Sequence, residues 1–265
     1  MSVLHPDLLS AGADQALPVH VILKDGVLDP AVAVWARAHD FTGKAGQLLV
    51  LPDPKGTLAG ALFGAGDSFD PGSARGLAAR LPAGVWRLEG LPVAEAGAAA
   101  LAFALGAYRF DRYRTRSDTA RPRLIAPDGM DVAGTLRIVA ACELAREMVD
   151  TPAADMGPLQ IETIAREIAS ESGASIAVTE GEALLEANYP AIHAVGRAAS
   201  PARQPRLIEI GWQMDRTELP LVALVGKGVV FDTGGLNIKG GAGGWCWSQP
   251  SRTPSRPTLS GPATC

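Results

Sequence analysis

Cysteine and histidine are scarce in this sequence, and their placement excludes several kinds of site. Three cysteines occur among 265 residues, with no C-x-x-C spacing: Cys142, Cys246 and Cys265. Because the number of cysteines is odd and no two of them have metal-ligand spacing, the sequence indicates neither a disulfide framework nor a zinc-thiolate site. The histidines are scattered along the chain: His5, His20, His39 and His193. No metal-ligand spacing links them, so we expect ordinary surface or core roles.

Charge of one sign and long apolar runs are lacking too. The net charge is -4 and the pI is near 5.6, without a cluster of Lys and Arg, which argues against binding to nucleic acid or an anionic membrane. No apolar run reaches the roughly 18 residues that a membrane span needs. The first residues, MSVLHPDLLSAGADQ, lack the basic and apolar regions of a signal peptide. These absences predict a cytoplasmic protein.

Hydrophobic residues make up 47% of the chain, charged residues 20% and aromatic residues 5%. This composition is typical of a folded α/β protein, and the length suits two domains. In the first half, the predicted strands (19–24, 47–52, 85–90) alternate with the predicted helices (30–39, 73–81, 93–108). The alternation predicts an N-terminal α/β domain over residues 1–120.

A linker and a bridging helix are expected over residues 121–150. The arginine-rich stretch 108–123 contains interleaved aspartates and is interpreted as a solvated linker. Residues 131–150 follow a helical period that places four apolar side chains on one face: Leu136, Ala140, Leu144 and Met148.

A second α/β unit, residues 151–239, follows the bridging helix. Pro158 suits the first position of a helix over 159–172, and a further helix is expected near 180–188. Strands are expected at four places: 174–179, 191–196, 205–212 and 219–226. The last is apolar throughout, which predicts a strand buried on both faces.

The tail, residues 240–265, has a different composition. It contains four prolines and no Asp, Glu or Lys, and no periodicity is visible in it. Such a segment is typical of a disordered end. Its composition also resembles translation out of frame, which suggests a frameshift near Gly240.

The segment LVGKGVVFDTGGLNIK carries the candidate chemistry. Asp232 follows the last predicted strand, at the kind of sheet edge where α/β proteins bind ligands, and Lys227 and Lys239 flank it. A phosphate-binding loop is excluded because it needs Gly at position 221 and Ser or Thr at 228. An aspartic protease needs a second Asp-Thr-Gly or Asp-Ser-Gly segment, and none occurs. A metal site and a buried ion pair remain equally compatible with the spacing.

The same segment, with AREMVDTPAADMGP and YPAIHAVGRAASPARQPRLIEIGW before it, resembles the cytosol (leucyl) aminopeptidase family. The resemblance implies a smaller N-terminal α/β domain, a catalytic domain with a mixed, mostly parallel sheet, and generally a homohexamer. It implies release of N-terminal residues from peptides by water that two metal ions, Zn, Mn or Mg, activate. By this resemblance Lys227 and Asp232 are metal ligands, and Lys239 polarises the scissile carbonyl.

The resemblance stops after Lys239. The family continues with a D-M-G-G-type segment and then N-T-D-A-E-G-R, which supply the other carboxylate ligands and an arginine, and neither segment occurs here. Asp155 and Glu162 are upstream carboxylates, but helix capping and solvation explain their positions. We therefore expect a C-terminally truncated or frameshifted member of the family that is inactive by itself. The alternative is a non-catalytic interaction or subunit-like protein that uses the N-terminal domain.

Overall fold

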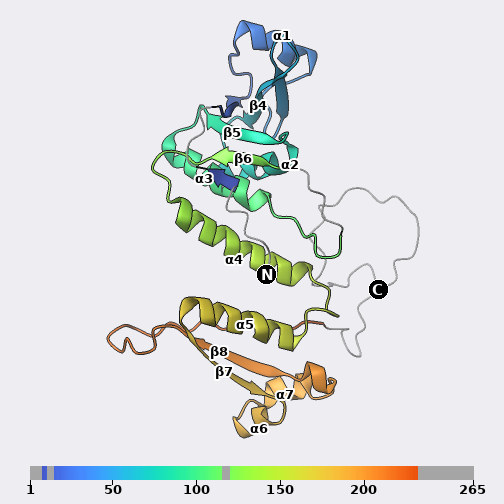
Figure 1. Cartoon of the computed structure of the whole chain (residues 1–265), viewed down its shortest axis with the longest axis vertical. Coiled ribbons are helices and arrows are strands. Elements are labelled where there is room, and N and C mark those ends of the chain that lie inside the picture. The colour runs from blue at the N-terminus through green and yellow to red at the C-terminus, as the bar shows by residue number, and fades with distance from the viewer. Residues whose placement is uncertain (1–7, 11–14, 115–119, 232–265) are drawn as a thin grey trace, which may run out of the picture. The chain divides into compact units, whose positions relative to one another are not determined.

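The computed structural model of the protein describes residues 8–10, 15–114 and 120–231. The chain divides into two compact units, unit 1 (residues 1–145) and unit 2 (residues 146–265). Figure 1 shows the elements of both units. The predicted tail lies outside the described residues, as do Asp232 and Lys239.

A six-stranded sheet forms the centre of unit 1, in the order β1-β6-β5-β2-β4-β3. The strands are β1 (Leu9–Ser10), β2 (Leu17–Leu23), β3 (Leu48–Pro52), β4 (Leu58–Gly66), β5 (Gly84–Glu89) and β6 (Pro122–Ile125). All neighbouring strands are parallel except β3 and β4, which are antiparallel. The predicted α/β class is confirmed, and the mixed, mostly parallel sheet, which was expected in the catalytic domain, is the sheet of unit 1.

The helices of unit 1 are α1 (Pro30–Ala38), η2 (Pro71–Gly76), α2 (Leu77–Arg80), α3 (Val93–Gly106) and the first part of α4 (Val132–Asp150). The Asp29 carboxylate accepts a hydrogen bond from the Ala31 amide at 2.8 Å and caps α1 ahead of Pro30. Asp70 caps η2 in the same way through the Gly72 amide. Local sequence thus sets where these helices begin.

The main core of unit 1 lies between the sheet and the helices α2 and α3. Trp86, Phe63 and Phe103 are its largest fully buried side chains. The Trp86 indole N–H donates to the Pro82 carbonyl at 2.9 Å, which satisfies its one polar atom. Burial on this scale gives unit 1 a hydrophobic core of its own.

Three strands of the sheet, β1, β4 and β6, were not predicted from the sequence. β4 reads LAGALFGAG, which lacks the β-branched residues typical of strands, although it pairs with both β2 and β3. β6 has four residues and begins at Pro122, inside the stretch interpreted as a linker. Because β6 pairs with β5, the sheet of unit 1 continues past residue 120.

Helix α4 was predicted correctly, but its buried face differs from the expected one. Val139 and Glu143 are buried, and Val132 and Leu136 pack against the core of unit 1. Of the four expected apolar positions, only Leu136 belongs to that core cluster. The face of α4 that is buried is therefore rotated about the helix axis relative to the predicted face, and it includes Glu143.

Unit 2 contains α5 (Pro158–Ser172), β7 (Ser175–Glu180), α6 (Ala183–Glu186), α7 (Pro190–Gly196), η3 (Pro201–Arg203) and β8 (Arg206–Gly211). β7 and β8 form a two-stranded antiparallel sheet that α5 contacts. Figure 1 shows α5 lying along these strands. Pro158 stands at the first position of α5, as predicted.

Two strand predictions in unit 2 are wrong. Residues 191–196 lie in helix α7, which begins at Pro190, a residue suited to a first helical turn. Residues 219–226 belong to no described helix or strand, and their large side chains are exposed: Leu224 at 95% and Val225 at 96%. Within the described residues, no strand lies beside this segment. Its apolar side chains are therefore neither part of a sheet nor buried.

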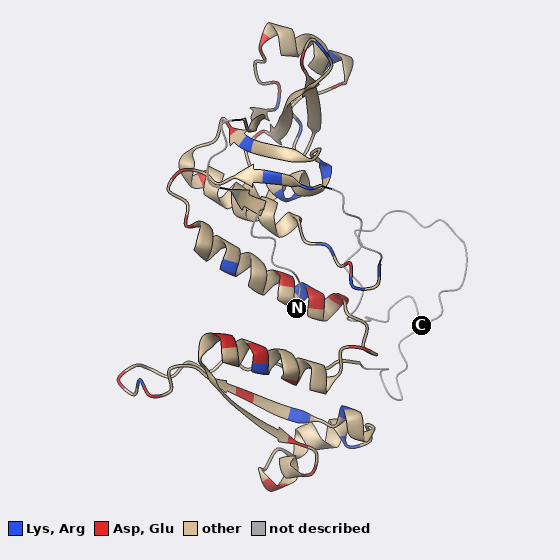
Figure 2. Ribbon diagram, viewed as in Figure 1, with Lys and Arg blue, Asp and Glu red and all other residues tan. Residues whose placement is uncertain are grey.

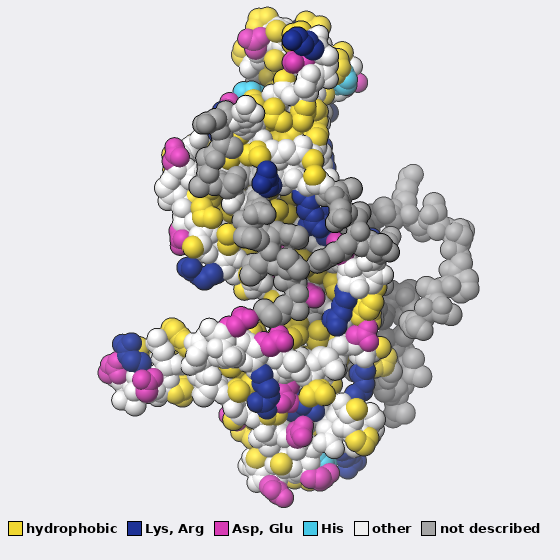
Figure 3. All heavy atoms as spheres, in the orientation of Figure 1, with side chains coloured by type: hydrophobic (Ala, Val, Ile, Leu, Met, Phe, Trp, Pro, Cys, Tyr) yellow, Lys and Arg dark blue, Asp and Glu magenta, His cyan; other side chains and the backbone are white. Residues whose placement is uncertain are grey.

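Within the described residues, no helix is both long and apolar enough to cross a membrane. Lys and Arg are interspersed with Asp and Glu over both units (Figure 2). On the face shown in Figure 3, hydrophobic side chains are mixed with polar ones. The visible surface thus has no extended area of a single charge.

Candidate functional site

Of the three predicted site residues, the structure describes only Lys227. It lies in the segment 220–231, which forms no helix or strand, and its side chain is exposed. Asp232 and Lys239 lie outside the described residues. The choice between a metal site and a buried ion pair therefore stays open, and the assignment of these residues remains a prediction.

The described residues contain no other cluster of metal ligands. Within them, no group of three or more His, Cys, Asp or Glu side chains could hold a metal ion. Two divalent cations a few ångströms apart repel each other and need several bridging carboxylates. The described donor set does not fit a two-metal centre by itself.

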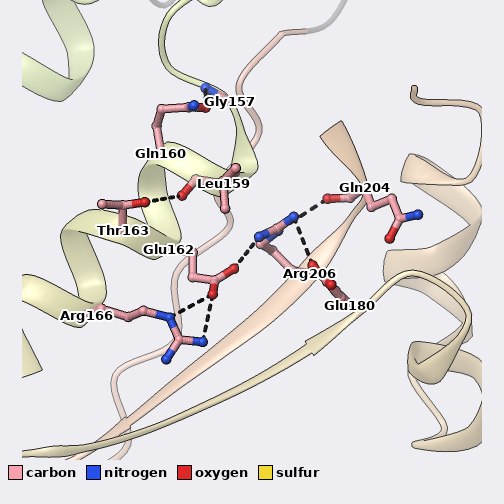
Figure 4. A network of polar contacts seen from close by, with 9 residues as sticks. All are labelled: Gly157, Leu159, Gln160, Glu162, Thr163, Arg166, Glu180, Gln204 and Arg206. Atoms are coloured by element: carbon pink, nitrogen blue, oxygen red, sulfur yellow. Dashed lines mark hydrogen bonds and ion pairs between the residues drawn. The ribbon is translucent and has the colours of Figure 1, made fainter. Parts of the chain in front are cut away.

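Glu162, one of the upstream carboxylates, is committed to a network of ion pairs in unit 2 (Figure 4). Its Oε1 accepts from the Arg166 Nε at 2.8 Å, and its Oε2 pairs with the Arg206 Nη1. Arg206 also contacts the Glu180 carboxylate at 3.0 Å. The network joins α5 to both β7 and β8, so this carboxylate acts as a structural group.

The antiparallel register explains this geometry. Glu180 and Arg206 stand directly opposite each other at the ends of β7 and β8. Glu162 and Arg166 are one helical turn apart on α5, which brings both side chains to the same face. The side chains of Glu162 and Arg206 are 11% and 6% exposed, so their charges compensate each other away from water.

Burial raises the pKa of the Glu162 carboxyl, but the hydrogen bonds and positive charges of Arg166 and Arg206 outweigh it. The pKa therefore lies below its ordinary value of 4.5. A carboxyl whose pKa is lowered by folding stabilises the folded state above its unfolded pKa. That contribution is lost as the pH falls through the folded pKa.

This pKa shift predicts an acid-sensitive contribution to the stability of unit 2. Replacing Glu162 with Gln is expected to lower the stability above about pH 4.5, and the difference from wild type should shrink as the pH falls further. Hydrogen exchange of the β7 amides between pH 3 and 7 measures this directly. Glu171→Gln, at an exposed position of the same helix, is the control. A pH-independent difference would contradict the prediction.

The connection between α4 and α5 is held by a second set of contacts within unit 2. The Arg203 guanidinium donates to the carbonyl oxygens of Ala153 and Ala154, the former at 2.9 Å. The Gln160 side chain accepts from the Gly157 amide at 2.9 Å and caps α5 (Figure 4). The roles of Arg203 and Arg206 were not predicted from the sequence, because Arg203 follows Ala153 by 50 positions and Arg206 follows Glu162 by 44.

Comparison with known proteins supports the family resemblance over most of the chain. The model of the M17 aminopeptidase N-terminal domain matches residues 22–127, and that of the cytosol aminopeptidase family catalytic domain matches residues 143–245. The second match includes the segment with Lys227, Asp232 and Lys239.

A probable cytosol aminopeptidase of Rhodococcus opacus is 36% identical over 240 residues, which cover 82% of this chain and 46% of that protein. The crystal structure of cytosol aminopeptidase from Coxiella burnetii has a TM-score of 0.78 at 32% identity, covering 89% of this chain and 52% of that one. The chain thus spans about half the length of the relatives it matches.

A third similar protein is the bottromycin maturation enzyme BotP, which was solved in complex with Mn. Its TM-score is 0.60 at 29% identity, and the match covers 75% of this chain and 45% of BotP. The family is metal-dependent. Both units are matched in chain order, and together with the architecture of the fold they lead to one conclusion: the chain belongs to the cytosol aminopeptidase family.

Proposed function

We propose that this chain supplies the N-terminal domain and the first part of the catalytic site of a metal-dependent leucyl aminopeptidase. The substrates would be peptides with a free N-terminus. The catalytic-domain match over residues 143–245 carries this proposal, because it includes the complete segment GKGVVFDTGGLNIK.

In this proposal Lys227 and Asp232 are metal ligands, and Lys239 polarises the scissile carbonyl. Two divalent cations, when bound, would supply activated water and stabilise the developing oxyanion. Mn or Zn suits an oxygen and amine donor set, and the Mn complex of BotP supports the first. By the same family resemblance we propose a cytoplasmic location and a homohexamer for the assembled enzyme.

The 265 residues alone are expected to be inactive. One carboxylate and one amine provide too little negative charge to hold two cations against their mutual repulsion. The purified chain, supplied with Mn or Zn, should not hydrolyse leucine p-nitroanilide above the buffer rate. Hydrolysis that a chelator abolishes, and that Asp232→Asn also abolishes, would overturn the expected inactivity.

An interaction role for the N-terminal domain is the second candidate. The observation that favours it is the contrast in packing between the units. The two described core clusters lie entirely within unit 1. A domain with its own core can fold and bind without a catalytic site. Co-purification of the full chain with an intact relative that this chain does not activate would support this role.

A further inference from the structure

The sequence contains two Asp-Gly pairs, and the structure gives them different surroundings. One pair, Asp25 and Gly26, follows β2, and the other, Asp128 and Gly129, lies between β6 and α4 (Figure 1). Glycine has no side chain that would keep its amide nitrogen away from the carboxyl group of the preceding aspartate. An Asp-Gly pair is therefore prone to intramolecular attack of that nitrogen on the carboxyl carbon, unless the fold holds the glycine amide.

The pair of Asp128 and Gly129 is open to this attack. It forms the middle of a β-turn that the Met130 amide closes by donating to the Pro127 carbonyl at 3.2 Å, and the φ of Gly129 is 75°. Both residues of the pair are exposed, and a Cβ atom at Gly129 would meet no atom within 4 Å. Within the described part of the chain, no hydrogen bond engages the Gly129 amide or the Asp128 carboxylate. Neither packing nor hydrogen bonding thus keeps the two groups apart.

The pair of Asp25 and Gly26 has the same chemistry but a held backbone. The Asp25 amide donates to the Thr42 carbonyl at 3.0 Å, and the Gly26 amide donates to the Leu23 carbonyl at 3.0 Å. Gly26 is also crowded, because a Cβ atom there would lie 2.9 Å from the Leu23 carbonyl oxygen. The Gly26 nitrogen can attack only after this hydrogen bond opens, so the population of the opened state limits the rate.

We propose that Asp128 is a site of spontaneous isomerisation to isoaspartate and that the fold protects Asp25 from the same reaction. In the first step, the Gly129 nitrogen bonds to the Asp128 Cγ, the carboxyl hydroxyl and the amide proton leave as water, and a succinimide ring forms. In the second step, water adds to the former main-chain carbonyl carbon of Asp128, and the bond from that carbon to the Gly129 nitrogen breaks. The product has the original mass, a main chain that runs through Cγ, and a free α-carboxylate. The reaction needs no oxidant or metal and is independent of the proposed peptidase function.

Isomerisation would alter the start of α4. The new linkage adds the Cβ atom of Asp128 to the main chain, so the Met130 amide can no longer close the same turn. Asp131 follows the turn and caps α4, because its carboxylate accepts a hydrogen bond from the Gly134 amide at 2.8 Å. We therefore expect faster hydrogen exchange in residues 130–135 of the isomerised chain, and unchanged exchange in β5.

Peptide mapping of the full chain tests the proposal. The protein is aged at mildly acidic pH and physiological temperature and then digested with trypsin. Fragmentation that distinguishes isoaspartate from aspartate is applied to residues 124–137 and 25–37, which contain the two pairs. We expect isoaspartate to accumulate at Asp128 about tenfold faster than at Asp25, because a hydrogen bond must open at Asp25 first. In urea, where both pairs are unfolded, the two rates should become equal.

Asp128→Glu is the control variant. It keeps the charge, but the longer side chain cannot form the five-membered ring with the Gly129 nitrogen. After the same treatment this variant should contain no isoaspartate in residues 124–137. Isoaspartate that persisted there would belong to Asp131 and overturn the proposal. Equal rates at Asp128 and Asp25 in the native chain, a faster reaction at Asp25, or no product at either residue would overturn it as well.

Discussion

Replacing Arg206 with Met is expected to destabilise unit 2 by about 3 kcal/mol, the lower end of the range for removing one partner from a buried ion pair. The Arg206 side chain is 6% exposed and pairs with both Glu162 and Glu180. Its removal leaves the Glu162 carboxylate, 11% exposed, with one remaining cation. The lower end applies because Arg166 still neutralises part of that charge.

Arg166→Met is the matched control for this substitution. Arg166 contacts the same carboxylate but is 53% exposed, and it forms an i,i+4 pair on one helix. Water screens such a pair, so its removal should cost only about 0.5 kcal/mol. The difference between the two variants therefore reports the burial of Arg206 together with its second ion pair, to Glu180.

Hydrogen exchange of the amides in β7 and β8 measures both variants in the full chain. Exchange in unit 1 serves as an internal reference, because neither substitution alters the core around Trp86 and Phe103. If Arg166→Met proved as damaging as Arg206→Met, the network would not join α5 to the sheet as the structure indicates.

Much of the fold follows from short-range patterns in the sequence. Short apolar runs predicted β2, β3 and β5, and helical periods predicted α1 and α5, the latter with Pro158 at its first position. These signals work because each element carries its own period and its own start. They do not depend on the partner that each element packs against.

The wrong or missing predictions concern segments whose conformation depends on the elements that they pack against. β4 is rich in Gly and Ala, and tertiary pairing with β2 and β3 makes it a strand. Residues 191–196, AIHAVG, are too few to separate a strand from a helix by their apolar pattern, and Pro190 at the first position favours α7. Residues 219–226 have a strong strand pattern, but no described strand pairs with them.

The candidate site, too, could be predicted from the sequence only as far as its local motif. The motif around Asp232 can be identified in the sequence because the residue types and their spacing are local. Whether Lys227 and Asp232 face a metal depends on groups far away in the chain. Arg206 illustrates the difficulty, since its pairing with Glu162 spans 44 positions and depends on how α5 packs against β8.

The second large effect is expected at Gly106, the last residue of α3. A Cβ atom at this position would lie 2.0 Å from the Arg75 carbonyl oxygen and 2.8 Å from the Arg75 carbonyl carbon. Both atoms belong to the backbone at the end of η2, so the contact cannot be relieved by a side-chain rotation. Gly106→Ala should therefore force α3 and η2 apart and destabilise unit 1 by about 1–3 kcal/mol.

Gly97→Ala, in the same helix, is expected to have the opposite sign. A Cβ atom at Gly97 meets no other atom within 4 Å, and Ala favours a helix interior over Gly by about 1 kcal/mol. Both substitutions add one methyl group to α3, so intrinsic helix propensity should favour each of them. Hydrogen exchange of the amides in β5, which carries the buried Trp86, should show the two variants on opposite sides of wild type. Stabilisation by both would mean that α3 and η2 do not approach each other this closely, whereas opposite signs would show that their packing outweighs helix propensity at Gly106.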